Sequence, residues 1–265
     1  LLHAITIKYA FIVGLAARGR DVNVIHTLAG LGYLFAGDGW KPKLYRTLVT
    51  PFFKRAFISP RTKLIFQNPD DMALMIKRGF ADRHASFLIK GSGVDLEQFQ
   101  AVPEPETDRP LVLFPTRLVW EKGVRPFIEA AKILEQKGIE ARYAIAGGIS
   151  TTNPSGITKA EMEEELKDSP VEWLGHVSNM PALLQESAII AYPSWYGEGV
   201  PKVLLEALAS ARPIITTDHA GCRETVRHGK NGYLVPVKDT HTLSQRIEEL
   251  VRNPQLRTIM GQTSR

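Results

Sequence analysis

Two glutamates bracket a predicted helix start, with Glu198 inside a short glycine-containing turn and Glu206 after seven intervening residues. Pro201 lies between them, and its fixed φ suits the first turn of a helix, so the sequence predicts a helix from this point to about Ser210. The unpaired N–H groups and the positive dipole end of such a helix start favour an anionic group such as a phosphate. The alternative for Glu206 is a solvated position beside Lys202 on the polar side of the helix.

A second group of charged residues follows a predicted strand. The run Thr116-Arg-Leu-Val-Trp-Glu-Lys-Gly123 comes directly after the apolar residues 111–114. Ligands of open α/β sheets bind beyond the carboxyl ends of the strands, so Arg117 and Lys122 are placed where a ligand would lie. Two cations there can offset the charge that develops on a departing diphosphate. A solvated surface loop is the alternative.

The Glu-x7-Glu spacing, the surrounding Glu-Gly-Val-Pro-Lys-Val-Leu-Leu-Glu-Ala run and the Arg117/Lys122 loop together resemble the retaining GT-B glycosyltransferases of family 4. The resemblance implies that Glu198 contacts hydroxyls of the donor sugar and that Glu206 contacts the ribose. It implies catalytic roles for Glu198, Arg117 and Lys122. These three residues and six others are implied to bind the donor: Gly148, Val177, Gly199, Val200, Pro201 and Glu206.

The elements that must position these residues alternate along the chain. Strands are predicted over 22–27, 63–66 and 86–89, with helices over 5–18 and 70–78 and a basic helix between the first two strands, which gives an αβαβαβ order. Residues 92–108 are rich in glycine, proline and acids and indicate a domain boundary. The alternation then resumes, and a second parallel sheet is predicted. We therefore predict an α/β protein with a partial N-terminal domain over 1–92, a linker over 93–108 and a C-terminal domain over 109–265. With the resemblance, this becomes a GT-B fold of two Rossmann-like, doubly wound domains facing a cleft, the first incomplete.

Composition sets further bounds. The 265 residues are 44% hydrophobic and 23% charged, which is typical of globular proteins. The only cysteine, Cys222, excludes an internal disulfide and is interpreted as a packing residue. The histidine His176 is likewise interpreted as structural. No Asp-x-Asp motif occurs, so we expect no metal and no other cofactor.

The positive charge is concentrated near the start of the chain. Residues 1–100 carry a net charge of +7, whereas the rest carries −2. Within the segment 41–63, seven cations occur without an acid among Phe52, Phe53 and Phe57, and Trp40 precedes it. This pattern is typical of an amphipathic segment on anionic lipid, with an ordinary core helix as the alternative. Nucleic acid fits less well, since no binding motif accompanies the charge. Residues assigned to the acceptor and membrane side are Gly30, Gly32, Lys54 and Arg55.

These observations lead to one hypothesis and its rivals. We expect a sugar to pass from a nucleotide sugar, such as a UDP-sugar, to a hydroxyl of a lipid-linked glycan, as in the bacterial enzymes that extend undecaprenyl-diphosphate-linked sugars. Such an enzyme would be cytoplasmic, at the inner face of the plasma membrane. The rivals are a nucleotide-sugar-binding fragment and a GT-B phosphorylase or epimerase. The sequence is expected to lack segments that the family has at both ends. His3 does not match the histidine that the family places near the sugar, and Ala211 stands where the family has a glycine.

Overall fold

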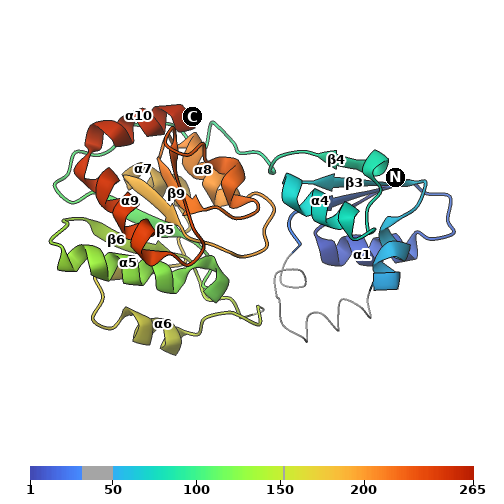
Figure 1. Ribbon diagram of the computed structural model, residues 1–265, viewed down its shortest axis with the longest axis horizontal. Coiled ribbons are helices and arrows are strands. Elements are labelled where there is room, and N and C mark those ends of the chain that lie inside the picture. The colour runs from blue at the N-terminus through green and yellow to red at the C-terminus, as the bar shows by residue number, and fades with distance from the viewer. Residues whose placement is uncertain (32–49, 152) are drawn as a thin grey trace. The chain divides into compact units, whose positions relative to one another are not determined.

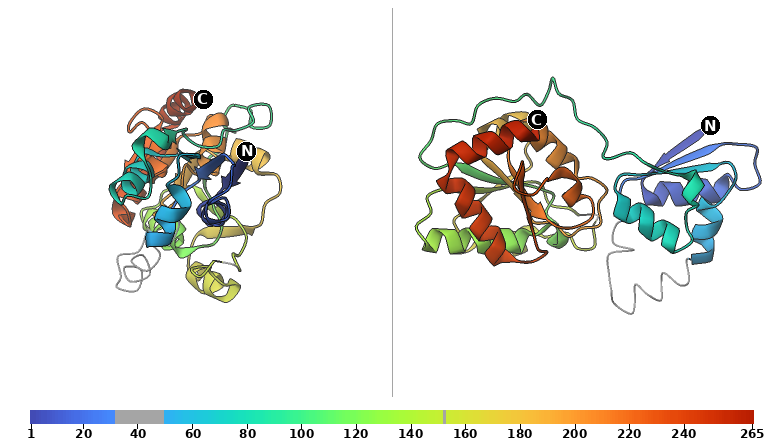
Figure 2. Two further views of the ribbon diagram at one scale, coloured as in Figure 1. Left: turned by 90° about the vertical axis from the view of Figure 1, so that its right-hand side faces the viewer. Right: turned by 45° about the horizontal axis from the view of Figure 1, so that its top comes forward.

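The computed structural model describes residues 1–31, 50–151 and 153–265. It divides into two compact units (Figures 1 and 2). The first unit contains Leu1–Ser92 and Tyr196–Pro201, and the second contains Gly93–Trp195 and Lys202–Arg265. Each unit is built around its own parallel sheet. The predicted α/β fold class is therefore confirmed.

The first unit has a four-stranded sheet in the order β1-β2-β3-β4. The sequence predicts a helix from Ile5, but the structure places an edge strand first and starts the helix at Ile7, so the order begins with a strand. The edge strand forms because Leu2 to Ile5 pair in register with Val24 to Thr27 of the next strand. The elements are β1 (Leu2–Ile5), α1 (Ile7–Ala16), β2 (Val24–Leu28), a helix over 50–57, β3 (Thr62–Phe66), α4 (Pro69–Lys77) and β4 (Ser86–Leu88).

The core of the first unit corrects the expectation for the aromatic residues of the basic segment. Phe53 and Phe57 are buried, and the Phe53 ring lies 5.0 Å from that of Phe11 and 5.5 Å from that of Phe57. Among the described aromatic residues of this segment, Phe52 is 54% exposed and lies outside this core. The expectation that Phe53 and Phe57 face lipid is therefore wrong, because both side chains are part of the core. Trp40, Gly32 and the part of the segment up to Val49 lie outside the described residues.

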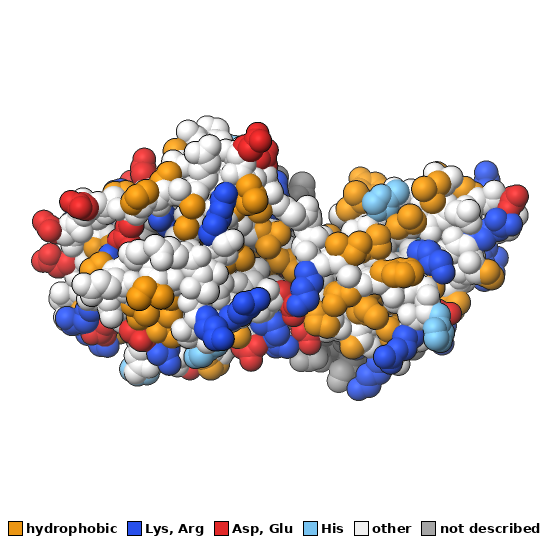
Figure 3. All heavy atoms as spheres, turned by 90° about the horizontal axis from the view of Figure 1, so that it is seen from above, with side chains coloured by type: hydrophobic (Ala, Val, Ile, Leu, Met, Phe, Trp, Pro, Cys, Tyr) orange, Lys and Arg blue, Asp and Glu red, His pale blue; other side chains and the backbone are white. Residues whose placement is uncertain are grey.

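The described helices of the first unit lie against one face of its sheet. Leu28, Leu64 and Phe66 point toward these helices and are fully buried. The register places Ile5, Thr27, Ile65 and Phe87 side by side on the opposite face. Ile5 and Phe87 are about half exposed there, and hydrophobic side chains gather on this unit in the view from above (Figure 3).

One titratable side chain lies inside this core. His26 in β2 has no exposed surface, and neither of its ring nitrogens has a hydrogen-bond partner among the described residues. Its ring meets the ring of Phe57 edge-on, with the centroids 5.5 Å apart. Burial, together with a smaller effect of the nearby His3, lowers the pKa of His26 from 6.5 to about 4. His26 is therefore neutral in the folded protein at neutral pH.

The second unit has a six-stranded parallel sheet in the order β10-β9-β8-β5-β6-β7. Its apolar strands are buried, because helices cover both faces in the way that parallel sheets require (Figure 1). Its strands are β5 (Leu111–Pro115), β6 (Arg142–Ala146), β7 (Val171–Gly175), β8 (Ile189–Tyr192), β9 (Ile214–Thr217) and β10 (Gly232–Val235). Its helices are α5 (Val124–Gln136), α6 (Lys159–Leu166), α7 (Met180–Glu186), α8 (Lys202–Ala209), α9 (Thr240–Arg252) and α10 (Pro254–Ser264).

The end of α8 explains the departure at position 211. Ala211 has a φ of 56°, in the left-handed region that favours glycine. The expected cost of an alanine there is on the order of 1 kcal/mol. The helix end is closed by Ala211 N–H and Arg212 N–H, which donate to the carbonyls of Leu208 and Ala207 at 3.0 Å. The Ala211 carbonyl then lies so close to Gly261 of α10 that a side chain there would overlap it.

The predicted linker, residues 93–108, packs against the rest of the second unit. Phe99 belongs to the hydrophobic core, and the Arg265 guanidinium donates to its carbonyl oxygen at 2.8 Å. Glu104 accepts hydrogen bonds from Nε and Nη2 of Arg257 at 2.6–3.0 Å. Arg257 lies in α10 and Arg265 directly follows it, and the sequence pattern did not predict this helix. Among the described helices, none is both long and apolar enough to cross a bilayer.

Candidate functional site

The strand order of the second unit predicts where a ligand would bind. The chain starts at β5, adds β6 and β7 on one side, and then returns to add β8, β9 and β10 on the other. The order therefore reverses between β5 and β8, and such a switch point is where open α/β sheets bind ligands beyond the strand ends. The Arg117/Lys122 loop follows β5, and Pro193 to Trp195 follow β8.

The two cations predicted for this loop lie in different environments. Arg117 is exposed. Lys122 closes a short 3-10 turn, Trp120–Lys122, and only 3% of it is exposed. Its ammonium donates a hydrogen bond to the phenol oxygen of Tyr192 at 2.7 Å. The sequence analysis did not single out Tyr192, although its position at the end of an apolar strand before Pro193 marks it as a strand-end residue.

The loop is fixed by main-chain hydrogen bonds on both sides. Leu118 N–H donates to the carbonyl of Gly148 at 3.1 Å, and Trp120 N–H donates to that of Ser155 at 3.1 Å. Gly123, with a φ of 96°, then lies so close to the Pro193 carbonyl that a side chain would overlap it. The turn that carries Lys122 is thus pressed against the end of β8.

The glycine pair after β6 has a clear packing role in one of its members. A Cβ on Gly147 would overlap the Thr116 carbonyl, which immediately precedes Arg117, whereas a Cβ on Gly148 would lie 3.7 Å from the Cβ of His176, an ordinary contact. The predicted donor residue is Gly148, and the residue that geometry requires to be glycine is Gly147. His176 is exposed, which does not fit a buried structural histidine.

Gly147→Ala is expected to lower the free energy of unfolding by about 1–3 kcal/mol, because the β5 and β6 ends must separate to admit the methyl group. Gly148→Ala makes the same chemical change one residue away and should leave stability nearly unchanged. Urea denaturation of the two variants and the wild type measures both. Equal losses would show that the close approach at Thr116 does not set the requirement.

The carboxylate on α8 is half-buried and paired. The Glu206 side chain is 12% exposed, and its Oε1 lies 3.5 Å from Nζ of Lys202. Burial raises the pKa of Glu206, while the Lys202 charge opposes this shift. The solvated position considered for Glu206 is therefore not what the structure contains. Val177, predicted to line the donor site, is half-buried after β7.

The residues 196–201 belong to the first unit, although they lie late in the chain. There, Val200 N–H donates to the side-chain oxygen of Gln67 at 3.2 Å, and the Asn68 amide donates to the Glu198 carbonyl at 3.4 Å. Gly30 lies against the backbone of Glu198 and Gly199 so closely that a side chain would overlap it. The predicted residues Gly30, Glu198, Gly199 and Val200 thus come together in this unit, and Gln67 and Asn68 are polar neighbours that the sequence analysis did not select.

Of the residues assigned to the acceptor and membrane side, Lys54 and Arg55 lie on the exposed surface of the helix over 50–57. Lys54 and Arg55 are exposed, next to Phe52. The Arg55 carbonyl accepts a hydrogen bond from the Arg18 guanidinium at 3.0 Å, which ties this helix to α1. Two exposed cations and one exposed aromatic side chain therefore lie on the described helix over 50–57.

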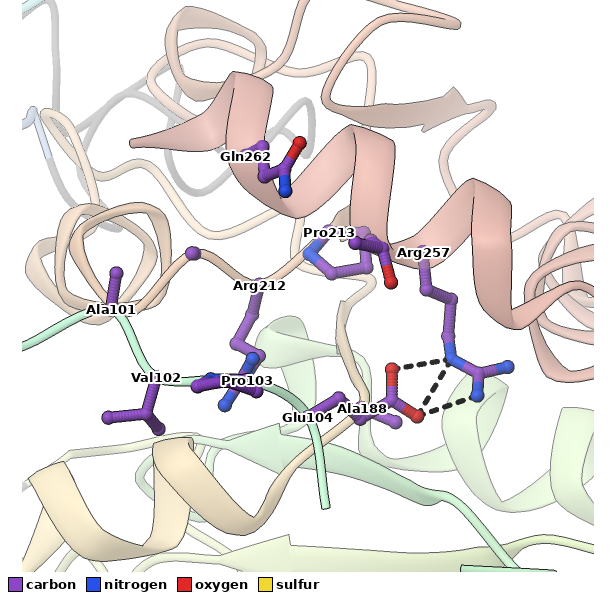
Figure 4. Close-up of a pocket in the computed structure, with 11 residues that line it drawn as sticks. Ala101, Val102, Pro103, Glu104, Ala188, Arg212, Pro213, Arg257 and Gln262 are labelled. Atoms are coloured by element: carbon purple, nitrogen blue, oxygen red, sulfur yellow. Dashed lines mark hydrogen bonds and ion pairs between the residues drawn. The ribbon is translucent and has the colours of Figure 1, made fainter. Parts of the chain in front are cut away.

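A separate cavity of about 300 Å³ lies at the other end of the second unit's sheet (Figure 4). It is lined by Ala188 and Pro213, which precede β8 and β9, and by Arg212 and the Glu104–Arg257 pair. It is thus at the amino ends of the strands, away from the Arg117/Lys122 loop. Over the described ranges, no group of three or more acidic, histidine or cysteine side chains is arranged to hold a metal ion.

Comparison with known proteins gives similarities at three levels. Residues 95–265 match the family model of the glycosyl transferases group 1. The chain is 30% identical over 240 residues to the N,N'-diacetylbacillosaminyl-diphospho-undecaprenol alpha-1,3-N-acetylgalactosaminyltransferase of Campylobacter jejuni, which covers 86% of this chain and 61% of that protein. It is 32% identical over 239 residues to the putative colanic acid biosynthesis glycosyltransferase WcaL of Escherichia coli, with 88% and 57% covered. The chain thus spans about three fifths of these relatives.

Solved structures show the same fold. Sucrose-phosphate synthase from Thermosynechococcus elongatus superposes with a TM-score of 0.84 at 19% identity, over 99% of this chain and 67% of that one. The Anabaena protein HepE in complex with UDP and glucose superposes with a TM-score of 0.81 at 18% identity, over 99% and 71%. At these identities the likeness concerns the fold alone, and it agrees with the predicted GT-B class.

Proposed function

The chain belongs to the group 1 glycosyl transferases, and from this premise we propose that it takes part in transferring a sugar from a UDP-sugar to a hydroxyl of a lipid-linked glycan, with retention at the anomeric carbon. The observation that carries the proposal is the Arg117/Lys122 loop at the switch point between β5 and β8. The Campylobacter relative is named for transfer to a diphospho-undecaprenol-linked sugar, which supports this class of acceptor.

In the proposed mechanism, Arg117 and Lys122 bind the diphosphate and offset the charge that develops on it as the glycosidic bond breaks. A guanidinium at the surface can meet the phosphate early, and the buried ammonium acts at a fixed position where water is excluded and the interaction is stronger. The two cations make a metal ion unnecessary in this proposal. The acceptor hydroxyl attacks from the face that the diphosphate leaves.

Further contacts of the donor follow from the resemblance. Glu206 would accept hydrogen bonds from the ribose, and main-chain groups of Gly148 and Val177 would enclose the base. Glu198 would orient the sugar, and Gly199, Val200 and Pro201 would lie along the phosphates. Burial of Glu206 favours this role, since a half-buried carboxylate that lacks its ligand hydroxyls is less well solvated than a surface one.

Calorimetric titration with UDP in the presence of EDTA tests the proposal. Arg117→Ala and Lys122→Met are each expected to weaken UDP binding by about 1.5–3 kcal/mol, the range for a hydrogen bond to a charged group. Arg142→Ala is the matched control, because it removes an exposed cation from the opposite end of β6. Binding that vanishes with EDTA, or equal affinities for all four proteins, would contradict the proposal. Turnover of a UDP-sugar then separates an enzyme from a binding fragment.

We also propose that the exposed side of the helix over 50–57 contacts an anionic membrane surface, which would place the enzyme on the inner face of the plasma membrane. Lys54 and Arg55 supply attraction of roughly 1 kcal/mol per cation near such a surface, and Phe52 can insert. Sedimentation with anionic and neutral vesicles tests this. Lys54→Glu with Arg55→Glu should reduce the bound fraction, and binding that is indifferent to lipid charge would argue against it.

A further inference from the structure

Tyr192 lies at the point where the Lys122 side chain ends. The two residues come from different elements, because Tyr192 is the last residue of β8 and Lys122 ends the turn after β5. Both are buried, with 2% and 3% of their surfaces exposed, and the ammonium donates to the phenol oxygen at 2.7 Å. An ammonium taken out of water needs such acceptors, and here one comes from the strand on the other side of the switch point.

The phenol is held in one position by its surroundings. The Tyr192 ring meets that of Phe114 in β5 edge-on, with centroids 5.8 Å apart. Its carbonyl accepts a hydrogen bond from the Thr216 hydroxyl in β9 at 2.7 Å. The next residue, Pro193, abuts Gly123, the residue after Lys122. The acceptor that Lys122 reaches is therefore held in its own strand, β8, by contacts with the two strands beside it, β5 and β9.

A lysine side chain has four rotatable bonds, and ordering it on a ligand costs conformational entropy. A lysine that is ordered before the ligand arrives avoids this cost, and its charge needs no reorganisation when the diphosphate departs. We propose that Tyr192 is a positioning residue that holds the Lys122 ammonium ready for the donor diphosphate. This inference rests on the proposed function of Lys122.

A double-mutant cycle with UDP as the probe tests the inference. Tyr192→Phe removes the acceptor and keeps the ring, and it is expected to weaken UDP binding about 10-fold or more when Lys122 is present. In the Lys122→Met background the same change should have almost no effect, because the partner it serves is gone. Tyr143→Phe is the matched control. Tyr143 is a buried tyrosine of β6 whose hydroxyl has no partner among the described residues, so its loss should not change UDP binding.

The outcomes separate the inference from the proposed function. If the wild type binds UDP and Tyr192→Phe binds it equally well, the positioning role is overturned and the proposed function stands. If Tyr192→Phe weakens binding by the same factor with and without Lys122, Tyr192 acts by another route and the inference is again overturned. If the wild type does not bind UDP, the proposed function fails and the inference fails with it. Urea denaturation of each variant shows that differences in binding arise from folded protein.

Discussion

Replacing Arg257 with methionine is expected to lower the free energy of unfolding of the second unit by about 3–5 kcal/mol. The guanidinium is 5% exposed and binds both carboxylate oxygens of Glu104. Its Nη1 also donates to the carbonyls of Leu250 and Val251 at the end of α9, at 2.6 and 2.9 Å. Methionine fills similar space but leaves a poorly solvated carboxylate without its partner and removes a donor from two carbonyls, of which, among the described residues, only that of Leu250 keeps another, Asn253 N–H at 3.3 Å. Removing one partner is the costly way to break a buried pair.

Arg252→Met is the matched control for this change. Arg252 forms an ion pair with Glu248 at 3.1 Å, but its side chain is 62% exposed, and exposed pairs contribute about 0–1 kcal/mol. Urea denaturation of the full chain, followed by tryptophan fluorescence, compares the two variants with the wild type. If Arg257→Met lowers the free energy of unfolding no more than Arg252→Met does, the Glu104–Arg257 ion pair does not stabilise the packing of the linker on α10.

His26→Leu is expected to remove a loss of stability that the wild type suffers in acid. Because the folded pKa is about 4 and the unfolded value is near 6.5, the unfolded chain alone takes up a proton between these pH values. The contribution of His26 is therefore constant above pH 6.5, falls as the pH drops toward 4, and amounts to a loss of about 3 kcal/mol below that. Leucine has no proton to bind and suits the apolar core.

Stability measured from pH 7.5 to 4 gives the difference between the wild type and His26→Leu. The difference is needed because burial raises the pKa of Asp71 to about 6, which the Asn68 hydrogen bond opposes and the Asp70 charge reinforces. Asp71 therefore changes stability in the opposite direction over part of the same range. His84→Gln, at an exposed position, should follow the wild-type curve. A difference between the wild type and His26→Leu that does not vary with pH would rule out His26 as the cause.

The elements of the second unit could largely be predicted from the sequence, since their buried strands are short apolar runs separated by turns. The start of α4 also carries a local signal, because the Asn68 side chain caps the helix by accepting from Asp71 N–H at 2.8 Å. Two elements, β1 and α10, could not be predicted from the local sequence pattern. The strand β1 has four residues and depends on pairing with β2, and α10 follows α9 after Asn253 alone, with Pro254 in its first turn.

The site was predicted less completely, for physical reasons that differ between residues. Spacing places Arg117 and Lys122 on one loop but does not say that one is exposed and the other buried. The burial of Lys122 depends on Tyr192 at the end of β8, 70 positions later. In the same way, Phe52 and Phe53 are adjacent and chemically identical, and only the direction of the helix over 50–57 makes one exposed and the other part of the core.

The open face of the first unit's sheet affects how the protein can be handled. Ile5, Ile65 and Phe87 lie together on that face, although parallel sheets normally have both faces covered. Apolar area exposed to water in this way promotes association between molecules as the solution becomes more concentrated. Heats of dilution from such association would overlap the calorimetric signal of ligand binding. Binding curves for this chain should therefore be recorded at several protein concentrations, with a dilute fluorescence assay as the reference.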